Sequence, residues 1–299
     1  MVHSLALLLV CFTLGLLARA SGRFPEATVP VLNAWVLRVA MPALVLQAVH
    51  ALGPVGGLVP AVAGLWLAFL VVAVPGLVAL RLGWLTRPRA GALILSLGLG
   101  NTAFVGLPLV EGLAGREGLA VAVVVDQLGS FLLLSLVALP LAAHLGGGAL
   151  SWRALVSRVV LFPPVLALVA ALLLRPWAYP AWAEQVLGRL GQTLSPLALF
   201  SVGYQLRLSG LRGRLHVLAL GLGYKLVAAP LLVALALGAL GLSGLPYKVA
   251  VVQAGMASMV TAALLASEWK LEPELPALMV GLGVPLSFLT GPWVWRLVG

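Results

Sequence analysis

A polar pair, Asn101 and Thr102, interrupts one of the long apolar stretches of the chain, and Gly100, Gly106 and Pro108 surround it. Glycine and proline lower helix propensity, and proline also lacks the N–H that the helical ladder needs. Backbone groups freed at membrane depth must face protein or a water-filled cavity, because lipid offers no hydrogen bonds. We therefore expect the three residues to break a helix, as in the binding sites of secondary transporters.

A second polar interruption follows in the other half of the chain, between Gln253 and Thr261. Asn101 offers amide donors and an acceptor, and a half-helix beginning after it would present free N–H groups to a carboxylate. We expect Asn101 to contact an anionic substrate. The alternative is that the polar groups only cap helix ends. The other members of the expected substrate site near the two interruptions are Thr102, Gln253, Gly255, Ser258 and Thr261.

Three charged side chains lie at depth within apolar stretches and could have a function. Asp126 and Lys225 fall near the middle of theirs, where charges are costly and are usually paired or functional. We expect Asp126 to take up and release a coupling proton beside Lys225, and a static ion pair between them is the alternative. Arg38 could reach the membrane interface or line the site and attract an anion.

The sequence offers little for other chemistry. Cys11 is the one cysteine, and the four histidines lack the spacing of metal ligands. Phosphate-loop, nucleophile-elbow and His-Glu-x-x-His motifs do not occur. We expect no catalytic residues, no metal site and no cofactor. A membrane enzyme is an alternative for which the sequence supplies no catalytic set.

The composition indicates an α-helical protein embedded in the lipid bilayer. Of the 299 residues, 62% are hydrophobic and 9% are charged, whereas soluble domains carry about 25% charged residues. Apolar windows long enough to cross a membrane recur along the chain. We expect about ten spans, near residues 3–20, 30–50, 57–80, 90–114, 118–143, 153–174, 182–206, 213–240, 246–268 and 274–297.

The formal net charge of +10 serves as a topology signal, because the basic residues cluster in short loops. We therefore expect no nucleic-acid partner. With the N-terminus outside, four basic residues fall in outer loops and a larger set in inner loops. We therefore expect a protein of the inner (plasma) membrane with both termini on the extracytoplasmic side. The inner set is Arg19, Arg23, Arg81, Arg87, Arg89, Arg153, Arg158, Arg207, Arg212, Arg214 and Lys270.

The two halves of the chain resemble each other at an offset of about 154 residues. Five spans in each half is an odd number, so the second half enters the membrane from the opposite side. The same offset makes Gly255 the counterpart of Asn101. We expect a first five-helix repeat over residues 1–145, a linker over 146–151 and an inverted repeat over 152–299. The matched pairs are Pro42 with Pro196, Pro75 with Pro230, and Gly129 with Gly283.

The stretch from Gly100 to Leu109 resembles the fourth-helix motif of the auxin efflux carrier family, the prokaryotic relatives of plant PIN transporters. The resemblance extends over the whole chain in span number, repeat and loop lengths. It implies the fold shared with bile-acid symporters and sodium/proton antiporters, with broken spans four and nine crossing at mid-membrane. Spans one, two, six and seven would form a scaffold and the others a transport domain. Relatives often carry a proline where this chain has Ala257.

The resemblance also implies a function. We expect an elevator-type secondary transporter of small organic anions, such as auxin-like or dicarboxylate acids, with a homodimer formed through the scaffold helices. Coupling to H⁺, coupling to Na⁺ and uncoupled transport all stay open. The alternative is a sodium/proton antiporter, or a sodium-coupled carrier of another substrate such as bile-acid-like compounds.

Overall fold

The computed structural model describes residues 2–50, 52, 57–206 and 215–299. Arg207, Arg212 and Arg214, which the charge pattern assigns to an inner loop, lie outside these ranges. The first half contains α1 (Val2–Ser21), α2 (Thr28–Trp35), η1 (Val36–Ala40), α3 (Met41–His50), α4 (Leu58–Arg81), α5 (Arg87–Gly98), η2 (Thr102–Gly106), α6 (Leu107–Val125), η3 (Asp126–Phe131), η4 (Leu134–Ala138) and α7 (Leu139–Leu145), where η marks a π-helix.

The second half follows after the segment 146–151. It contains α8 (Trp152–Val160), α9 (Pro163–Leu174), α10 (Ala181–Gln192), α11 (Leu194–Gln205), α12 (Leu215–Gly223), η5 (Tyr224–Ala228), α13 (Ala229–Ala239), α14 (Gly244–Ala254), α15 (Val260–Glu268) and α16 (Glu274–Leu297).

These helices fall into the ten predicted windows. Five segments of the described chain are each long and apolar enough to cross a membrane: Thr28–His50, Leu58–Arg81, Thr102–Leu145, Leu215–Ala239 and Glu274–Leu297. The bent pair α8 and α9 can form a sixth span, with 55° between them. Gly115 divides the longest segment, because its φ of 65° and ψ of −156° are not helical. The protein is thus an all-α, multi-pass membrane protein.

Four π-helical segments end two residues before a proline. A proline ring clashes with the carbonyl of the preceding turn, and the widened π turn accommodates this clash without ending the helix. Gly106 and Pro108, expected as helix breakers, therefore lie inside the helical stretch 102–114, and that expectation was wrong. The pairs are η1 with Pro42, η2 with Pro108, η4 with Pro140, and η5 with Pro230.

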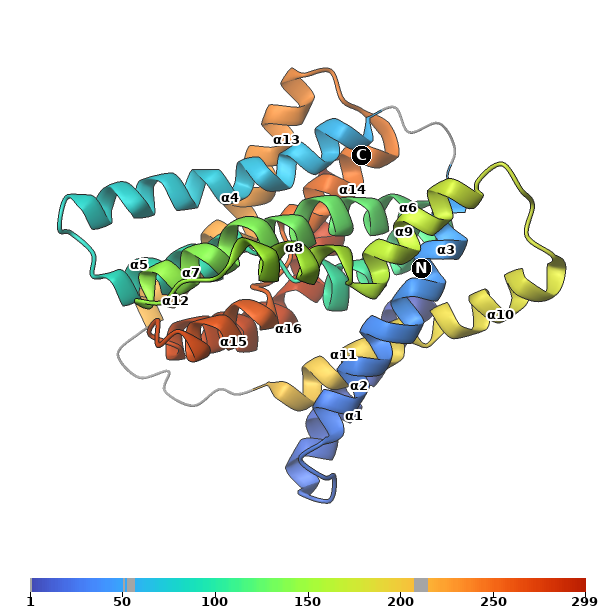
Figure 1. Ribbon diagram of the computed structural model, residues 1–299, viewed down its shortest axis with the longest axis horizontal. Coiled ribbons are helices and arrows are strands. Elements are labelled where there is room, and N and C mark those ends of the chain that lie inside the picture. Colours follow the sequence, from blue (N-terminus) through green and yellow to red (C-terminus); the bar gives the residue numbers. More distant parts are fainter. Residues whose placement is uncertain (1, 51, 53–56, 207–214) are drawn as a thin grey trace.

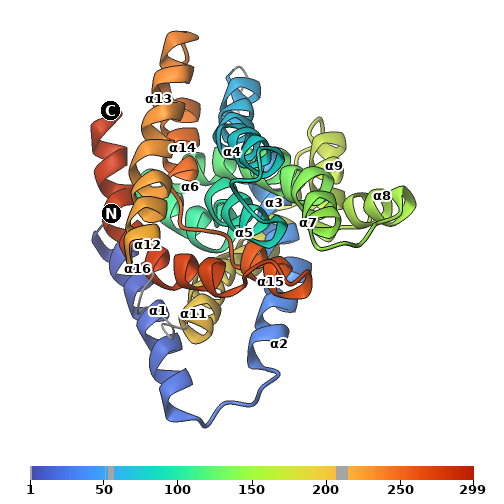
Figure 2. The ribbon, with the colours of Figure 1, turned by 90° about the vertical axis from the view of Figure 1, so that its left-hand side faces the viewer.

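The helices pack in two groups. In one group α1 lies along α11, and α3 packs against α9 and α10; in the other, α4 packs against α5, α13 and α14 (Figures 1 and 2). The first group holds spans one, two, six and seven. Its closest contact relies on two glycines, because a Cβ on Gly15 would lie 2.2 Å from the carbonyl oxygen of Phe200, and one on Gly203 would lie 2.2 Å from that of Phe12.

Candidate functional site

Two broken helices cross in the middle of the molecule. Helix α5 ends at Gly98 and helix α14 ends at Ala254, and each continues as a new helix after an extended stretch. The two stretches run antiparallel: the Asn101 N–H donates to the Ala257 carbonyl at 2.7 Å, and the Met259 N–H donates to the Leu99 carbonyl at 3.1 Å. Each break therefore supplies hydrogen bonds that the other needs at membrane depth.

The crossing shifts the register of the repeat. Gly100 pairs with Ser258, and one hydrogen bond lies on each side of this pair. The two bonds are equivalent by the symmetry of the repeat if Asn101 is the counterpart of Met259. Asn101 and Met259 are also the residues immediately before the new helices. The expected counterpart Gly255 is therefore wrong by four residues. The expectation used an offset taken from other spans. That offset does not hold here, because the second break is longer than the first.

Asn101 has the capping role that was the alternative considered from the sequence. Its Oδ1 accepts a hydrogen bond from the Phe104 N–H at 3.2 Å and so caps the new helix. Its Nδ2 has no hydrogen-bond partner, although the residue is only 2% exposed. Asn101 borders a cavity of about 340 Å³, a volume that suits a small ligand. The amide nitrogen is thus a buried donor that no protein group uses, in a residue that lines the cavity.

This cavity, which we call the crossing cavity, lies between the two helix groups. Its polar lining comes from span two, the two breaks and spans five to seven, and the rest is mostly aromatic and aliphatic. Of the expected substrate site it contains Asn101 and Thr261. The polar lining residues are Asn33, Asn101, Asp126, Gln127, Arg158, Gln205 and Thr261.

Asp126 is held by two hydrogen bonds at the edge of this cavity. The Thr102 hydroxyl donates to Asp126 Oδ1 at 2.6 Å, and the Gln127 amide donates to Oδ2 at 2.8 Å. The side chain is 3% exposed. Asp126 and Lys225, both in the described part of the chain, do not form an ion pair with each other. Lys225 instead borders a separate small cavity on the other side of the crossing.

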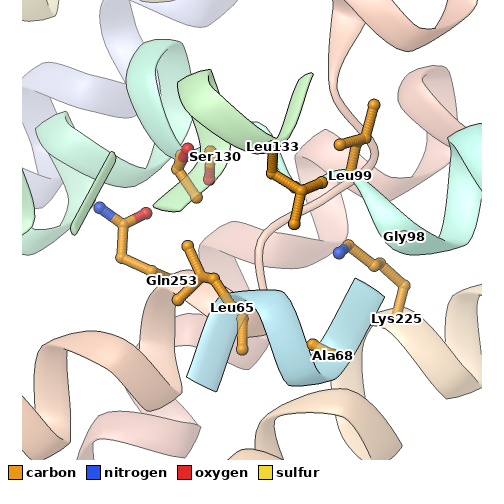
Figure 3. Close-up of a pocket in the computed structure, with 11 residues that line it drawn as sticks. Leu65, Ala68, Gly98, Leu99, Ser130, Leu133, Lys225 and Gln253 are labelled. Carbon is orange, nitrogen blue, oxygen red and sulfur yellow. The ribbon is translucent and has the colours of Figure 1, made fainter. Parts of the chain in front are cut away.

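The other expected site residues lie around that second cavity or within the packing. Figure 3 shows Gln253 and Lys225 beside it. The Ser258 hydroxyl donates to the Ser96 carbonyl and so caps the end of α5. A Cβ on Gly255 would lie 3.0 Å from the Pro230 ring, so Gly255 serves close packing.

Arg38 and Arg158 border an open cleft of about 510 Å³ next to the crossing cavity, and Arg158 borders both spaces. The charge pattern placed Arg158 among the loop arginines, but it lies in α8. Arg38 is exposed and borders only the outer cleft.

Sequence reasoning missed three polar residues of the crossing cavity, namely Asn33, Gln127 and Gln205. The Ser201 hydroxyl donates to Asn33 at 2.7 Å, and the Gln205 amide donates to the Ser201 hydroxyl at 3.1 Å. Gln127 lies beside Asp126 on η3. Each is an amide side chain within an apolar window, and this signal could have identified all three.

The antiparallel crossing of two broken helices in a ten-window helical fold defines a membrane transporter. A family model described as "Membrane transport protein" matches the chain twice, over residues 1–151 and 150–294. The chain belongs to this family, the auxin efflux carrier family. It is 28% identical over 298 residues to an uncharacterized transporter of Methanothermobacter thermautotrophicus, with 97% of this chain and 95% of the relative covered. It is 23% identical over 302 residues to one of Methanocaldococcus jannaschii, with 98% and 97% covered.

Proposed function

We propose that the protein is a secondary transporter of small organic anions and that the anion binds in the crossing cavity. The observation that carries this proposal is the meeting of two donor groups there. Asn101, whose buried Nδ2 has no hydrogen-bond partner, borders the cavity, and so does the first turn of α15, whose preceding residue Met259 provides no side-chain cap. Uncapped N–H groups and the positive end of a helix dipole favour a carboxylate.

Arg158 supports the choice of an anion. It is the basic residue that borders both the outer cleft and the crossing cavity. A cation at the mouth of a cleft raises the local concentration of anions and speeds their entry.

Asp126 supports coupling to protons. An anion beside its carboxylate is repelled when Asp126 is charged and is not repelled when Asp126 is protonated. Binding of the anion and binding of a proton therefore favour each other, and the two would move together.

The position of the cavity supports an elevator mechanism. Asn33 and Gln205 lie on the first helix group, whereas Asn101, Asp126 and Thr261 lie on the spans assigned to the transport domain. Sliding of this domain past the first group would carry the anion across the membrane. In this proposal the termini are extracytoplasmic, in the plasma membrane, and the first group provides a dimer contact.

Transport by purified protein in liposomes tests the proposal. Radiolabelled mono- and dicarboxylates are first screened by counterflow, in which unlabelled substrate inside drives uptake of label. We expect saturable uptake of one class, and at least a tenfold loss in Asn101→Ala. Thr290→Ala is the matched control, because the hydroxyl of this half-buried residue bonds only within its own helix. Saturable uptake that is unchanged in Asn101→Ala would contradict the proposed site.

A further inference from the structure

Lys225 is buried on the side of the crossing opposite the crossing cavity. It is 1% exposed and lies in the π-helical segment η5. Among the described residues it forms no ion pair, although a buried lysine in a membrane normally needs a negative partner. The negative partner must therefore come from something other than a carboxylate.

The C-terminal ends of two half-helices lie near the Lys225 ammonium group. Lys225 Nζ lies 3.4 Å from the point where a Cβ on Gly100 would sit, and the Gln253 backbone carbonyl oxygen lies 3.3 Å from the same point. Figure 3 shows the Lys225 nitrogen directed toward Gly98 and Leu99. Helices α5 and α14 both end here, and each C-terminal end carries about half a negative charge. Two such ends together balance about one ammonium group.

The space around Nζ also offers side-chain oxygens. Lys225, Thr102, Ser130 and Gln253 border a cavity of about 10 Å³, which is the room of about one water molecule. Gln253 is 0% exposed, and neither atom of its amide has a hydrogen-bond partner. Unwound backbone carbonyls and the C-terminal ends of half-helices coordinate Na⁺ in transporters, and side-chain oxygens beside them add to such a ligand set.

We propose that the Lys225 ammonium group is a tethered cation, held where these oxygens would otherwise bind a free monovalent cation. The folded crossing therefore needs no Na⁺. Truncation of the lysine leaves an oxygen-lined site that a small cation can enter. This inference is independent of the transported substrate.

Thermal unfolding of the purified full-length protein tests the tethered cation. The salts are NaCl, KCl, methylammonium chloride and N-methylglucamine chloride at equal ionic strength, the last having a cation too large to enter. For wild type we expect the same Tm in all four salts. Lys225→Ala should lose about 5 °C or more in N-methylglucamine chloride and regain at least half of the loss in NaCl or methylammonium chloride.

Two variants separate charge from packing. Lys225→Met fills the space without a charge, so its Tm should fall and should not recover in any salt. Lys248→Ala is the matched control, because this lysine bonds the C-terminal Gly299 away from the crossing, and its Tm should not depend on the cation.

Three results would overturn the tethered cation. They are a wild-type Tm raised by Na⁺, a Lys225→Ala Tm that no small cation restores, and a Lys225→Met protein as stable as wild type. If Lys225→Ala does not stay folded in N-methylglucamine chloride, the yield of monodisperse protein on size-exclusion chromatography is compared between the salts in place of Tm. Recovery in NaCl or methylammonium alone supports the site, and recovery in no salt contradicts it.

Discussion

Thr102 Oγ1 donates a hydrogen bond to Asp126 Oδ1 over 2.6 Å. Thr102 is the first helical residue after the break in span four, and Asp126 begins the π-helical segment of span five. The bond therefore ties the buried carboxylate of the crossing cavity to the backbone of the crossing. Any change in the charge of Asp126 acts on the broken helix through this contact.

Removal of the Thr102 hydroxyl should destabilise the protein. Thr102→Val keeps the shape of the side chain but leaves one oxygen of a buried carboxylate without its donor. We expect a loss of about 1–3 kcal/mol in the free energy of unfolding, measured as a lower Tm in detergent. Thr290→Val removes a hydroxyl that bonds only its own helix backbone and should change Tm little. Equal Tm values for the two variants would show that the bond contributes nothing.

Neutralisation of Asp126 should separate transport from proton coupling. Asp126→Asn keeps an acceptor for Thr102 and removes the charge. We expect an imposed pH gradient to stop driving accumulation, while counterflow of the same substrate continues. Glu268→Gln, at the exposed end of α15, should respond to the gradient like wild type. Unchanged pH-driven accumulation in Asp126→Asn would exclude Asp126 as the coupling group.

Replacement of Arg158 should weaken the capture of anions. Arg158→Gln removes the cation shared by the outer cleft and the crossing cavity, so we expect KM to rise about tenfold with little change in kcat. The effect should shrink at high salt, because salt screens exposed charges. Arg153→Gln on the same helix does not border either space and should leave KM unchanged. A KM equally raised in both variants would indicate a general effect of surface charge.

The sequence predicted the helical spans and the first break because their signals are local. Apolar runs of span length mark helices, and Gly100 next to Asn101 marks a place where a helix is weak. Which side of the crossing a residue faces depends on the local backbone instead. Gln253 and Asn101 are both amides beside a break, yet Asn101 borders the crossing cavity and Gln253 the small one behind it.

The prolines show a second limit of local signals. Pro108 weakens a helix in isolation, but the turn before it widens into a π-helix and the span continues. Arg158 shows a third limit, since a basic residue near the end of a span looks the same in sequence whether it lies in a loop or beside a cavity. Both outcomes depend on tertiary packing.

Gly106 should be intolerant of any side chain, although it does not break the helix. A Cβ there would lie 2.2 Å from Gln253 Oε1 and 3.2 Å from Met256, so the buried Gln253 side chain would have to shift within tight packing. We expect Gly106→Ala to cost about 1–3 kcal/mol in the free energy of unfolding. Gly238→Ala is the matched control, because a Cβ on that helical glycine meets nothing within 4 Å, and it should raise Tm slightly. If Gly106→Ala unfolds at the same temperature as wild type, the close packing of Gln253 against this glycine does not limit stability. Shortening the opposing side chain in Gly106→Ala/Gln253→Ala should restore part of the lost Tm, since the clash is with the end of that side chain.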